Sequence, residues 1–420
     1  MNAPTTARLS VNGSRLVADL TALGSIGRGP GSGLDRTSFS GADREARAWL
    51  LGRCAEAGLS VQVDGIGNFV MSPDYDDHIA DRPAVWSGSH IDTVPNGGAF
   101  DGALGVLAAL ECLRRIQEER PALDRPVRAV MFTDEEGNYA HLFGSSALAR
   151  GFSRTELESL TGRDGDLFAD TFGAAGGDLD AAAATKLDPS ALHATVELHI
   201  EQGPTLEQLG HDIGVVTGIV ALGGGVVSFR GRADHAGTTP MDRRRNALTA
   251  AGALLVALPD VAASVSERAV VTSGIVTVEP GSANVIPGLA RVTVDFREAE
   301  ADLVDMLQTA IVDVAREVAL RHGVQAEFDF EVTIPPVQLD ANIQATIANA
   351  AAARELSYSL LPSGAGHDSQ NMAQLAPTGM IFVPSIDGRS HCPEENTAWT
   401  DVENGANVLL DTLLSLASDE

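Results

Sequence analysis

The chain has 420 residues, which is too long for one ordinary hydrophobic core, so two domains are expected. Apolar residues make up 44% and charged residues 20%, a globular balance that excludes a disordered or collagen-like chain. Acidic residues outnumber Lys plus Arg by 57 to 29, and the net charge of −28 disfavours binding to nucleic acid or to anionic membrane surfaces.

The first elements in chain order predict a sheet covered by helices. Ser40 is placed to cap a helix that runs to about Ala57 and stops at Gly58. Apolar residues at helical spacing predict a second helix over Gly102–Gln117. Short apolar runs predict strands at Ser60–Val63, Ala84–Ser87 and Val127–Thr133. The last two strands and the helix between them form a β-α-β unit, which is typical of α/β folds.

The pattern of predicted elements changes over residues 213–330, where strand-like runs alternate with helical ones. The strand-like runs are Gly225–Arg230, Ala269–Val278 and Ala290–Phe296, and the helical runs are Asn246–Val256 and Ala301–Arg321. This alternation predicts a small α+β sandwich inserted into the chain. We therefore predict a first domain formed by residues 1–212 and 331–420, and an inserted domain formed by residues 213–330.

A histidine and two aspartates follow the predicted strand at Ala84–Ser87. His90 and Asp92 alternate with Ile91, so they share one face. Asp101 lies in a glycine-rich loop that opens the next helix. Loops at the carboxyl ends of strands are where α/β folds place their sites. A histidine in such a loop is more often a hydrogen-bond partner than a metal ligand, so both roles stay open here.

Three consecutive acids, Asp134, Glu135 and Glu136, end the next predicted strand before Gly137. A turn at Gly137 would let one carboxylate bind a metal ion while its neighbour works as a base. The alternative is a solvated acidic turn, which is common in a chain this acidic.

Two later segments carry further candidate ligands. Glu197, His199 and Glu201 alternate with apolar residues, so they share one face of a strand, and His199 is the candidate ligand. His391 follows a late apolar run. Its neighbour Cys392 would point elsewhere in an extended segment, so we expect a small buried side chain there and not a thiolate ligand.

Nitrogen and carboxylate donors without thiolates suit Zn²⁺, Mn²⁺ or a similar divalent ion in an open catalytic site. Two histidines with an aspartate on one side, and aspartate, glutamate and histidine on the other, would make a two-metal centre. The sequence has no G-x-S-x-G and no H-E-x-x-H, which disfavours a serine hydrolase or a zincin-like protease.

Taken in order, these motifs resemble the dinuclear-metal amidohydrolases of the aminoacylase/carboxypeptidase superfamily, and within it the hydantoinase/carbamoylase family. The resemblance covers nearly the whole chain. It rests on the segments GSHIDTVPNGGAFDGALGV, ELHIEQGP, HAGTTPM, SANVIPG and SGAGHD. It implies an α/β fold: a zinc-exopeptidase-like catalytic domain with a central mixed sheet flanked by helices, and an inserted α+β sandwich that serves as lid and dimerisation domain.

The resemblance also implies a role for each metal-site residue. His90 and His199 would hold one ion, Glu136 and His391 would hold the second, and Asp101 would bridge the two. The cofactors implied are two divalent metal ions per subunit, with Zn²⁺ expected first and Mn²⁺, Co²⁺ or Ni²⁺ as alternatives.

The catalytic residues implied by the resemblance are Glu135, His235 and Asp92. Glu135 would be the general base that deprotonates the attacking water and then protonates the leaving amine. Asp92 would orient His90, as ligating histidines usually require. His235 would contact a substrate oxygen and stabilise the oxyanion, commonly in the neighbouring subunit's site.

Four further residues are implied to bind substrate. Asn284 and Arg297 match positions that bind the α-carboxylate, for which an arginine fork is well suited. Gln202 would line the same pocket. His367 lies in a glycine-rich turn where a substrate contact and a structural hydrogen bond are equally open.

The chain departs from the family pattern after its paired glutamates. Many relatives continue with Gly-Ser/Ala-Arg-Phe, whereas this chain has Asn138, Tyr139, Ala140 and His141 after Gly137. The metal ligands and the base are untouched, so the departure bears on substrate choice. A reshaped side-chain pocket and a plain surface loop remain open.

The reaction implied is hydrolysis of the carbamoyl C–N bond of an N-carbamoyl-L-amino acid to amino acid, CO₂ and ammonia. The substrate class is a small N-carbamoyl or ureido carboxylate. Alternatives are an allantoate amidohydrolase, a β-ureidopropionase, an N-acyl-amino acid hydrolase or dipeptidase, and a catalytically silent relative. We expect a homodimer through the inserted domain, and no nucleic-acid or membrane partner.

Cysteine use and the start of the chain favour a cytoplasmic protein. The three cysteines, Cys54, Cys112 and Cys392, do not form a disulfide framework. Met1–Asn12 has no basic start followed by an apolar core, so no secretory signal is expected.

Overall fold

The computed structural model describes residues 8–75 and 77–418, and they divide into two compact units. Unit 2 consists of Gly218–Val337 and Pro362–Gly366, and unit 1 contains the other described residues. The predicted limits of the inserted domain, residues 213 and 330, both lie a few residues before the limits of the main segment of unit 2. The strand Ile213–Ile219 pairs mainly within the sheet of unit 1, and the strand Gln325–Ile334 pairs within unit 2.

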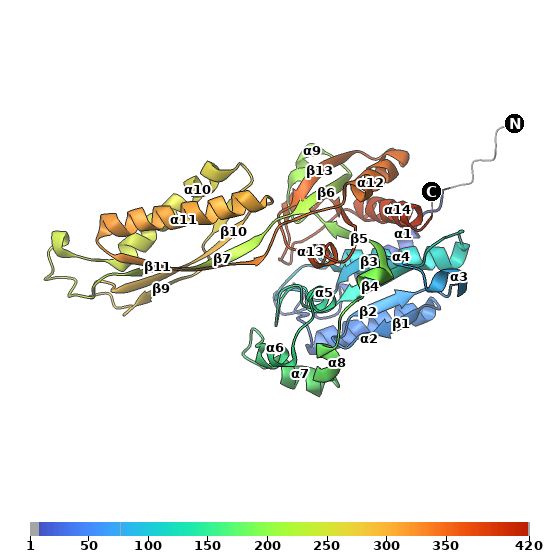
Figure 1. Cartoon of the computed structure of the whole chain (residues 1–420), viewed down its shortest axis with the longest axis horizontal. Coiled ribbons are helices and arrows are strands. Elements are labelled where there is room, and N and C mark those ends of the chain that lie inside the picture. Colours follow the sequence, from blue (N-terminus) through green and yellow to red (C-terminus); the bar gives the residue numbers. More distant parts are fainter. Residues whose placement is uncertain (1–7, 76, 419–420) are drawn as a thin grey trace. The chain divides into compact units, whose positions relative to one another are not determined.

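Unit 1 is built on a nine-stranded mixed sheet (Figure 1). The strand order is β1-β2-β4-β3-β5-β14-β6-β12, and β13 also pairs with β6. The neighbours β4, β3, β5 and β14 run parallel to one another. The strands are β1 Ser60–Val63, β2 Phe69–Ser72, β3 Ala84–His90, β4 Val127–Phe132, β5 Leu192–Ile200, β6 Ile213–Ile219, β12 Val337–Gln338, β13 Tyr358–Ser363 and β14 Thr378–Val383.

Helices cover both faces of this sheet. On one face α4 and α14 pack on β3 and β5, and on the other α5 packs on β4 while α13 packs on β5 and β14. Both faces of β3 are buried as a result. The helices are α1 Gly13–Leu23, α2 Gly41–Glu56, α3 Asp77–Ala80, α4 Ala103–Glu119, α5 Phe143–Ala149, α6 Arg154–Ser159, α7 Phe168–Ala174, α8 Leu179–Ala183, α9 Thr205–Leu209, α12 Ala341–Ala353, α13 Ser369–Met372 and α14 Trp399–Leu416, with 3₁₀ turns η1 Pro189–Ala191 and η3 Ile386–Gly388.

The elements predicted for the first part of unit 1 are confirmed. The Ser40 side chain accepts a hydrogen bond from the Asp43 amide and so caps α2, and the second predicted helix is α4. The three predicted strands are β1, β3 and β4. Helix α1 and strand β2 were not predicted.

Unit 2 is an antiparallel sheet covered by two long helices. The strand order is β11-β7-β10-β8, with β9 also paired to β10. Helices α10 and α11 pack together and against this sheet to form a separate core. The elements are β7 Leu222–Arg230, η2 Met241–Arg243, α10 Ala247–Val265, β8 Val270–Thr272, β9 Val276–Glu279, β10 Leu289–Arg297, α11 Ala301–His322 and β11 Gln325–Ile334.

Two predictions for unit 2 are wrong in detail. The run Ala269–Val278 is not one strand but two, β8 and β9, which pair with different parts of β10. The helix expected to end at Val256 continues to Val265 with Pro259 inside it. Leu258 and Val261 bury their side chains in the core there, and this packing outweighs the helix-breaking tendency of proline.

By length and composition, α10 would also be able to cross a membrane. The core helix of a globular domain passes the same test. Here one face of α10, with Ala250, Leu254 and Val261, is buried in the core of unit 2, and 33% of the apolar window is buried in all.

Candidate dinuclear metal site

Five candidate ligands gather at one edge of the unit 1 sheet because parallel strands end there together. Ligands on or after the strands are His90, the last residue of β3, His199 near the end of β5, Glu136 after β4 and His391 after β14. Asp101 comes from the loop that leads into α4. The chain thus delivers these side chains from four parallel strands and one helix start.

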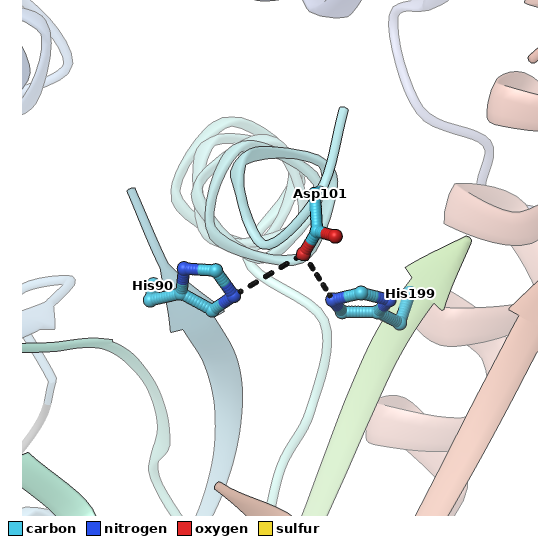
Figure 2. A group of neighbouring side chains, drawn as sticks. All are labelled: His90, Asp101 and His199. Atoms are coloured by element: carbon cyan, nitrogen blue, oxygen red, sulfur yellow. Dashed lines mark ion pairs between the residues drawn. The ribbon is translucent and has the colours of Figure 1, made fainter. Parts of the chain in front are cut away.

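The first ligand group is His90, Asp101 and His199, whose side chains point toward one another (Figure 2). Asp101 Oδ1 lies 3.4 Å from His90 Nε2 and 3.2 Å from His199 Nε2. All three residues are buried. Because one ligand atom from each lies within 4.8 Å of the others, the three atoms can surround a single ion.

The second ligand group is Asp101, Glu136 and His391. His391 Nε2 lies 3.3 Å from Asp101 Oδ2 and 3.5 Å from Glu136 Oε1. The two oxygens of Asp101 therefore face different groups, as a bridging carboxylate requires. The His391 side chain is 49% exposed, so this side of the centre is open. The donors fit two divalent ions of the Zn²⁺ or Mn²⁺ type with an accessible coordination position.

The electrostatics of the centre also favour cations. Burial, with Asp101 nearby, raises the pKa of Glu136 to about 7. The bond to Asp101 raises the pKa of His391 to about 9 against the effect of burial. Burial raises the pKa of Glu135 well above its ordinary value; His90 opposes the rise and Glu136 adds to it. A bound divalent ion would stabilise these crowded carboxylates in their charged form.

Glu135 lies where a base is expected. Its Oε2 is 3.4 Å from His90 Nε2, and its side chain is not part of either ligand group. Both glutamates lie in a turn that Asp134 fixes, because its carboxylate accepts the amides of Asn138 and Tyr139. Because the backbone turns here, the side chains of Glu135 and Glu136 can lie against different histidines, His90 and His391.

Asp92 contacts His90 more closely through its backbone than through its carboxylate. His90 Nδ1 lies 3.0 Å from the backbone carbonyl of Asp92 but 3.7 Å from its carboxylate. The carboxylate instead accepts the amides of Glu135, at 3.4 Å, and Glu136, at 3.2 Å. Asp92 therefore holds the His90 ring through its backbone and the paired glutamates through its side chain.

Gly102 is a site residue that the sequence reasoning missed. Its φ of +64° is strained for any side chain, and a Cβ there would lie 2.4 Å from the His90 ring. Its amide lies 3.1 Å from His199 Nε2. Only glycine lets α4 begin this close to both histidines. The signal was available as the Asp-Gly pair at the start of the predicted helix.

Two residues of the predicted substrate set lie beside the ligands in unit 1. Gln202 Nε2 donates to Asp101 Oδ2 at 2.7 Å, and Gln202 Oε1 is a buried acceptor without a hydrogen-bond partner among the described residues. The His367 ring is buried with its centroid 4.6 Å from that of His199. Glu201, expected on the same strand face as His199, instead accepts the amides of Thr205 and Leu206 at the start of α9.

The segment after the paired glutamates packs into unit 1. Tyr139 is buried against Phe39 and Phe168, and its hydroxyl donates to Asp166. This favours a structural role for Tyr139.

Arg163, which was not predicted, donates from its guanidinium to the backbone carbonyl of Glu136 at 2.7 Å. Cys392 is partly exposed, so the expectation of a buried side chain there is wrong.

The remaining predicted substrate residues lie at opposite ends of the unit 2 sheet. His235 pairs with Val285, and the Ala236 amide donates to Asn284, so His235 and Asn284 lie together. Their segments adjoin the Leu289 end of β10, whereas Arg297 is the last residue of that strand. The structure therefore brings together two of these three residues and separates the third.

Comparison with known proteins gives a consistent result. Residues 86–415 match the family described as Peptidase family M20/M25/M40. An N-carbamoyl-L-amino-acid amidohydrolase from Paenarthrobacter aurescens is 38% identical, over 92% of this chain and 94% of its own. An allantoate amidohydrolase from Escherichia coli K12 is 33% identical, over 94% and 96%. A crystal structure of a hydantoinase/carbamoylase family amidase from Burkholderia multivorans superposes with a TM-score of 0.87 at 34% identity, over 98% of this chain and 99% of that one.

Proposed function

The chain belongs to peptidase family M20/M25/M40 and, within it, to the hydantoinase/carbamoylase amidases, and we propose that it hydrolyses N-carbamoyl-L-amino acids. It is an amidohydrolase that acts on C–N bonds of linear amides, of the carbamoylase and allantoate amidohydrolase group. The observation that carries the proposal is Asp101, whose two oxygens face two separate ligand groups. The proposed products are amino acid, CO₂ and ammonia.

Two divalent ions, when bound, would polarise the carbamoyl carbonyl and lower the pKa of the attacking water. We propose Zn²⁺ as the resident ion, with Mn²⁺, Co²⁺ or Ni²⁺ as substitutes. Glu135 would take the proton of the attacking water and pass it to the leaving nitrogen. Its buried position beside His90 supports this role, since a carboxyl with a raised pKa holds a proton more readily.

Arg297 is proposed to bind the substrate carboxylate. Its guanidinium is held by Asp295 at 3.2 Å and by the carbonyl of Gly364 at 3.2 Å, and it remains partly exposed. Held in this way, the guanidinium still has N–H groups for a carboxylate. Gln202, with its unpartnered Oε1, is proposed to contact the substrate beside Asp101.

His235 is proposed to donate a hydrogen bond to the carbonyl oxygen as negative charge develops. Its Nδ1 accepts the amides of Gly237, at 3.0 Å, and Thr238, at 3.2 Å, so a neutral ring carries its proton on Nε2. The side chain is exposed. Asn284, on the adjoining segment, is proposed to bind the substrate carboxylate.

The separation within unit 2 supports a homodimer. Arg297 lies eight residues beyond Leu289 on β10, which is about 27 Å at about 3.4 Å per residue. A small substrate cannot touch Arg297 and the His235 segment of the same chain at once. We therefore propose that a second copy supplies His235 and Asn284. A cytoplasmic location is proposed from the free thiols of Cys54 and Cys112.

The test is ammonia release with Zn²⁺ or Mn²⁺ supplied and an EDTA control for each substrate. The panel holds several N-carbamoyl-L-amino acids, N-carbamoyl-β-alanine and allantoate, because named relatives of similar identity include both carbamoylases and allantoate amidohydrolases. EDTA-sensitive ammonia from N-carbamoyl-L-amino acids supports the proposal. Turnover confined to allantoate or N-carbamoyl-β-alanine would replace the substrate and keep the mechanism, and silence across the panel would refute both.

A further inference from the structure

The loops that carry Asp101 and His391 meet at one buried carboxylate, that of Glu395. Glu395 Oε1 accepts the backbone amides of Phe100 at 2.8 Å and Asp101 at 3.0 Å. Its Oε2 accepts the hydroxyl of Ser390 at 2.8 Å. One side chain thus fixes the backbone of the bridging aspartate and the residue next to the His391 ligand.

Ser390 connects this carboxylate to the bridging side chain itself. The Ser390 hydroxyl oxygen lies 2.8 Å from Asp101 Oδ2, the same distance as from Glu395 Oε2. A hydroxyl has one proton, so Ser390 donates to one of the two carboxylates at a time. Asp101 Oδ2 also lies 2.7 Å from Gln202 Nε2 and 3.3 Å from His391 Nε2, so its direction is set by neighbours from both loops and from the end of β5.

Glu395 is not placed there by an ordinary ion pair. It is 5% exposed and has no Arg or Lys within ion-pair distance among the described residues. A buried carboxylate without a cation is costly unless several donors satisfy it. The loop also leaves room for it, since a Cβ on Gly98 would lie 2.0 Å from the Glu395 carboxyl carbon. Gly98 therefore leaves space for the Glu395 carboxylate, a group that contributes little to hydrophobic packing.

We propose that Glu395 is a positioning residue of the metal centre, which holds the Asp101 bridge in register with His391 and so sets the affinity for the second ion. This rests on the proposed two-ion centre. Glu395 touches neither group's ligand atoms and acts through the Asp101 backbone and through Ser390. Outer partners of metal ligands commonly change metal affinity by about 10- to 100-fold when replaced.

The test compares Glu395→Gln with wild type. The glutamine keeps the shape and an oxygen for the two amides, but its NH₂ group cannot accept the Ser390 proton. Ser390→Ala is a second, smaller change at the same junction. Glu394→Gln is the matched control, because Glu394 is an exposed neighbour paired with Arg389 on the surface. Ions per chain are counted by mass spectrometry after dialysis at graded free Zn²⁺, alongside kcat, KM and the Tm of the metal-free protein.

The expected result is that Glu395→Gln and Ser390→Ala bind the second Zn²⁺ about 10- to 100-fold more weakly, with kcat restored at high Zn²⁺ and KM little changed. Glu394→Gln should match wild type. A lowered Tm with unchanged Zn²⁺ binding would show a merely structural role and overturn the inference. Wild type that binds fewer than two ions would overturn the two-ion centre as well, which separates that failure from a failure of Glu395 alone.

Discussion

Replacing Gly102 with alanine would place a methyl carbon against the His90 imidazole. Gly102 precedes α4 with φ +64° and ψ −46°, a region that side chains rarely adopt. The added Cβ would lie 2.4 Å from His90 Cε1 and Nε2, where nonbonded atoms normally stay about 3.5 Å apart. Either the start of α4 or the His90 ring must therefore move by about 1 Å.

The substitution should lower both the stability of the fold and the turnover, and the size of each effect can be calculated. Holding a non-glycine residue at such a φ costs about 1–3 kcal/mol of stability. A displacement of about 1 Å in a catalytic group is enough to lower turnover about 100-fold, which corresponds to about 2.7 kcal/mol. Because Nε2 is the atom of His90 that faces Asp101, the affinity for the first ion should fall together with kcat.

Gly52→Ala is the matched control, since a Cβ there meets nothing within 4 Å and the residue lies inside α2. That variant should gain about 0.5–1 kcal/mol from helix propensity and keep its activity. The assay is urea unfolding, with Zn²⁺ content and kcat measured on the same preparations. If Gly102→Ala retained wild-type Zn²⁺ content and kcat, the close approach of α4 to His90 would not control the site.

Three further variants test single roles. Glu135→Gln should lower kcat by about 10²–10⁴-fold while Zn²⁺ content stays at wild type, and retained turnover would remove Glu135 as the base. Arg297→Ala should raise KM about 10- to 100-fold for substrates with a carboxylate, from the loss of a charged hydrogen bond, and an equal loss on an uncharged analogue would contradict that role. Tyr139→Phe removes the bond to Asp166 and should cost about 0.5–1.5 kcal/mol of stability by urea unfolding, whereas an altered ranking of substrates would place Tyr139 in the pocket.

Much of unit 1 was predictable because local patterns and tertiary structure agree there. The helices α2 and α4 have apolar positions at helical spacing, and the Ser40 side chain caps α2. The strands β3 and β4 were predictable from short apolar runs, but β3 continues beyond its predicted end at Ser87 to His90. In unit 2 the same patterns predicted the existence of α10 but not its end, since the end of α10 depends on packing beyond Pro259.

The identity and order of the candidate ligands were set by the sequence itself. Each of His90, Glu136, His199 and His391 comes at or after a recognisable apolar run, and parallel strands deliver such residues to a common edge. The family resemblance then distinguished ligands from the other acids of a very acidic chain. The role of each donor type follows from its chemistry and needs no coordinates.

Only the tertiary structure decided how these residues are held. Asp101 faces two groups with different oxygens, Asp92 supports His90 with its backbone and Glu135 with its carboxylate, and Glu395 joins two ligand loops. The Asp92 and Glu395 arrangements depend on backbone amides and carbonyls, which every residue carries and no sequence pattern distinguishes. Contacts of that kind become visible only when segments far apart in the chain are placed side by side.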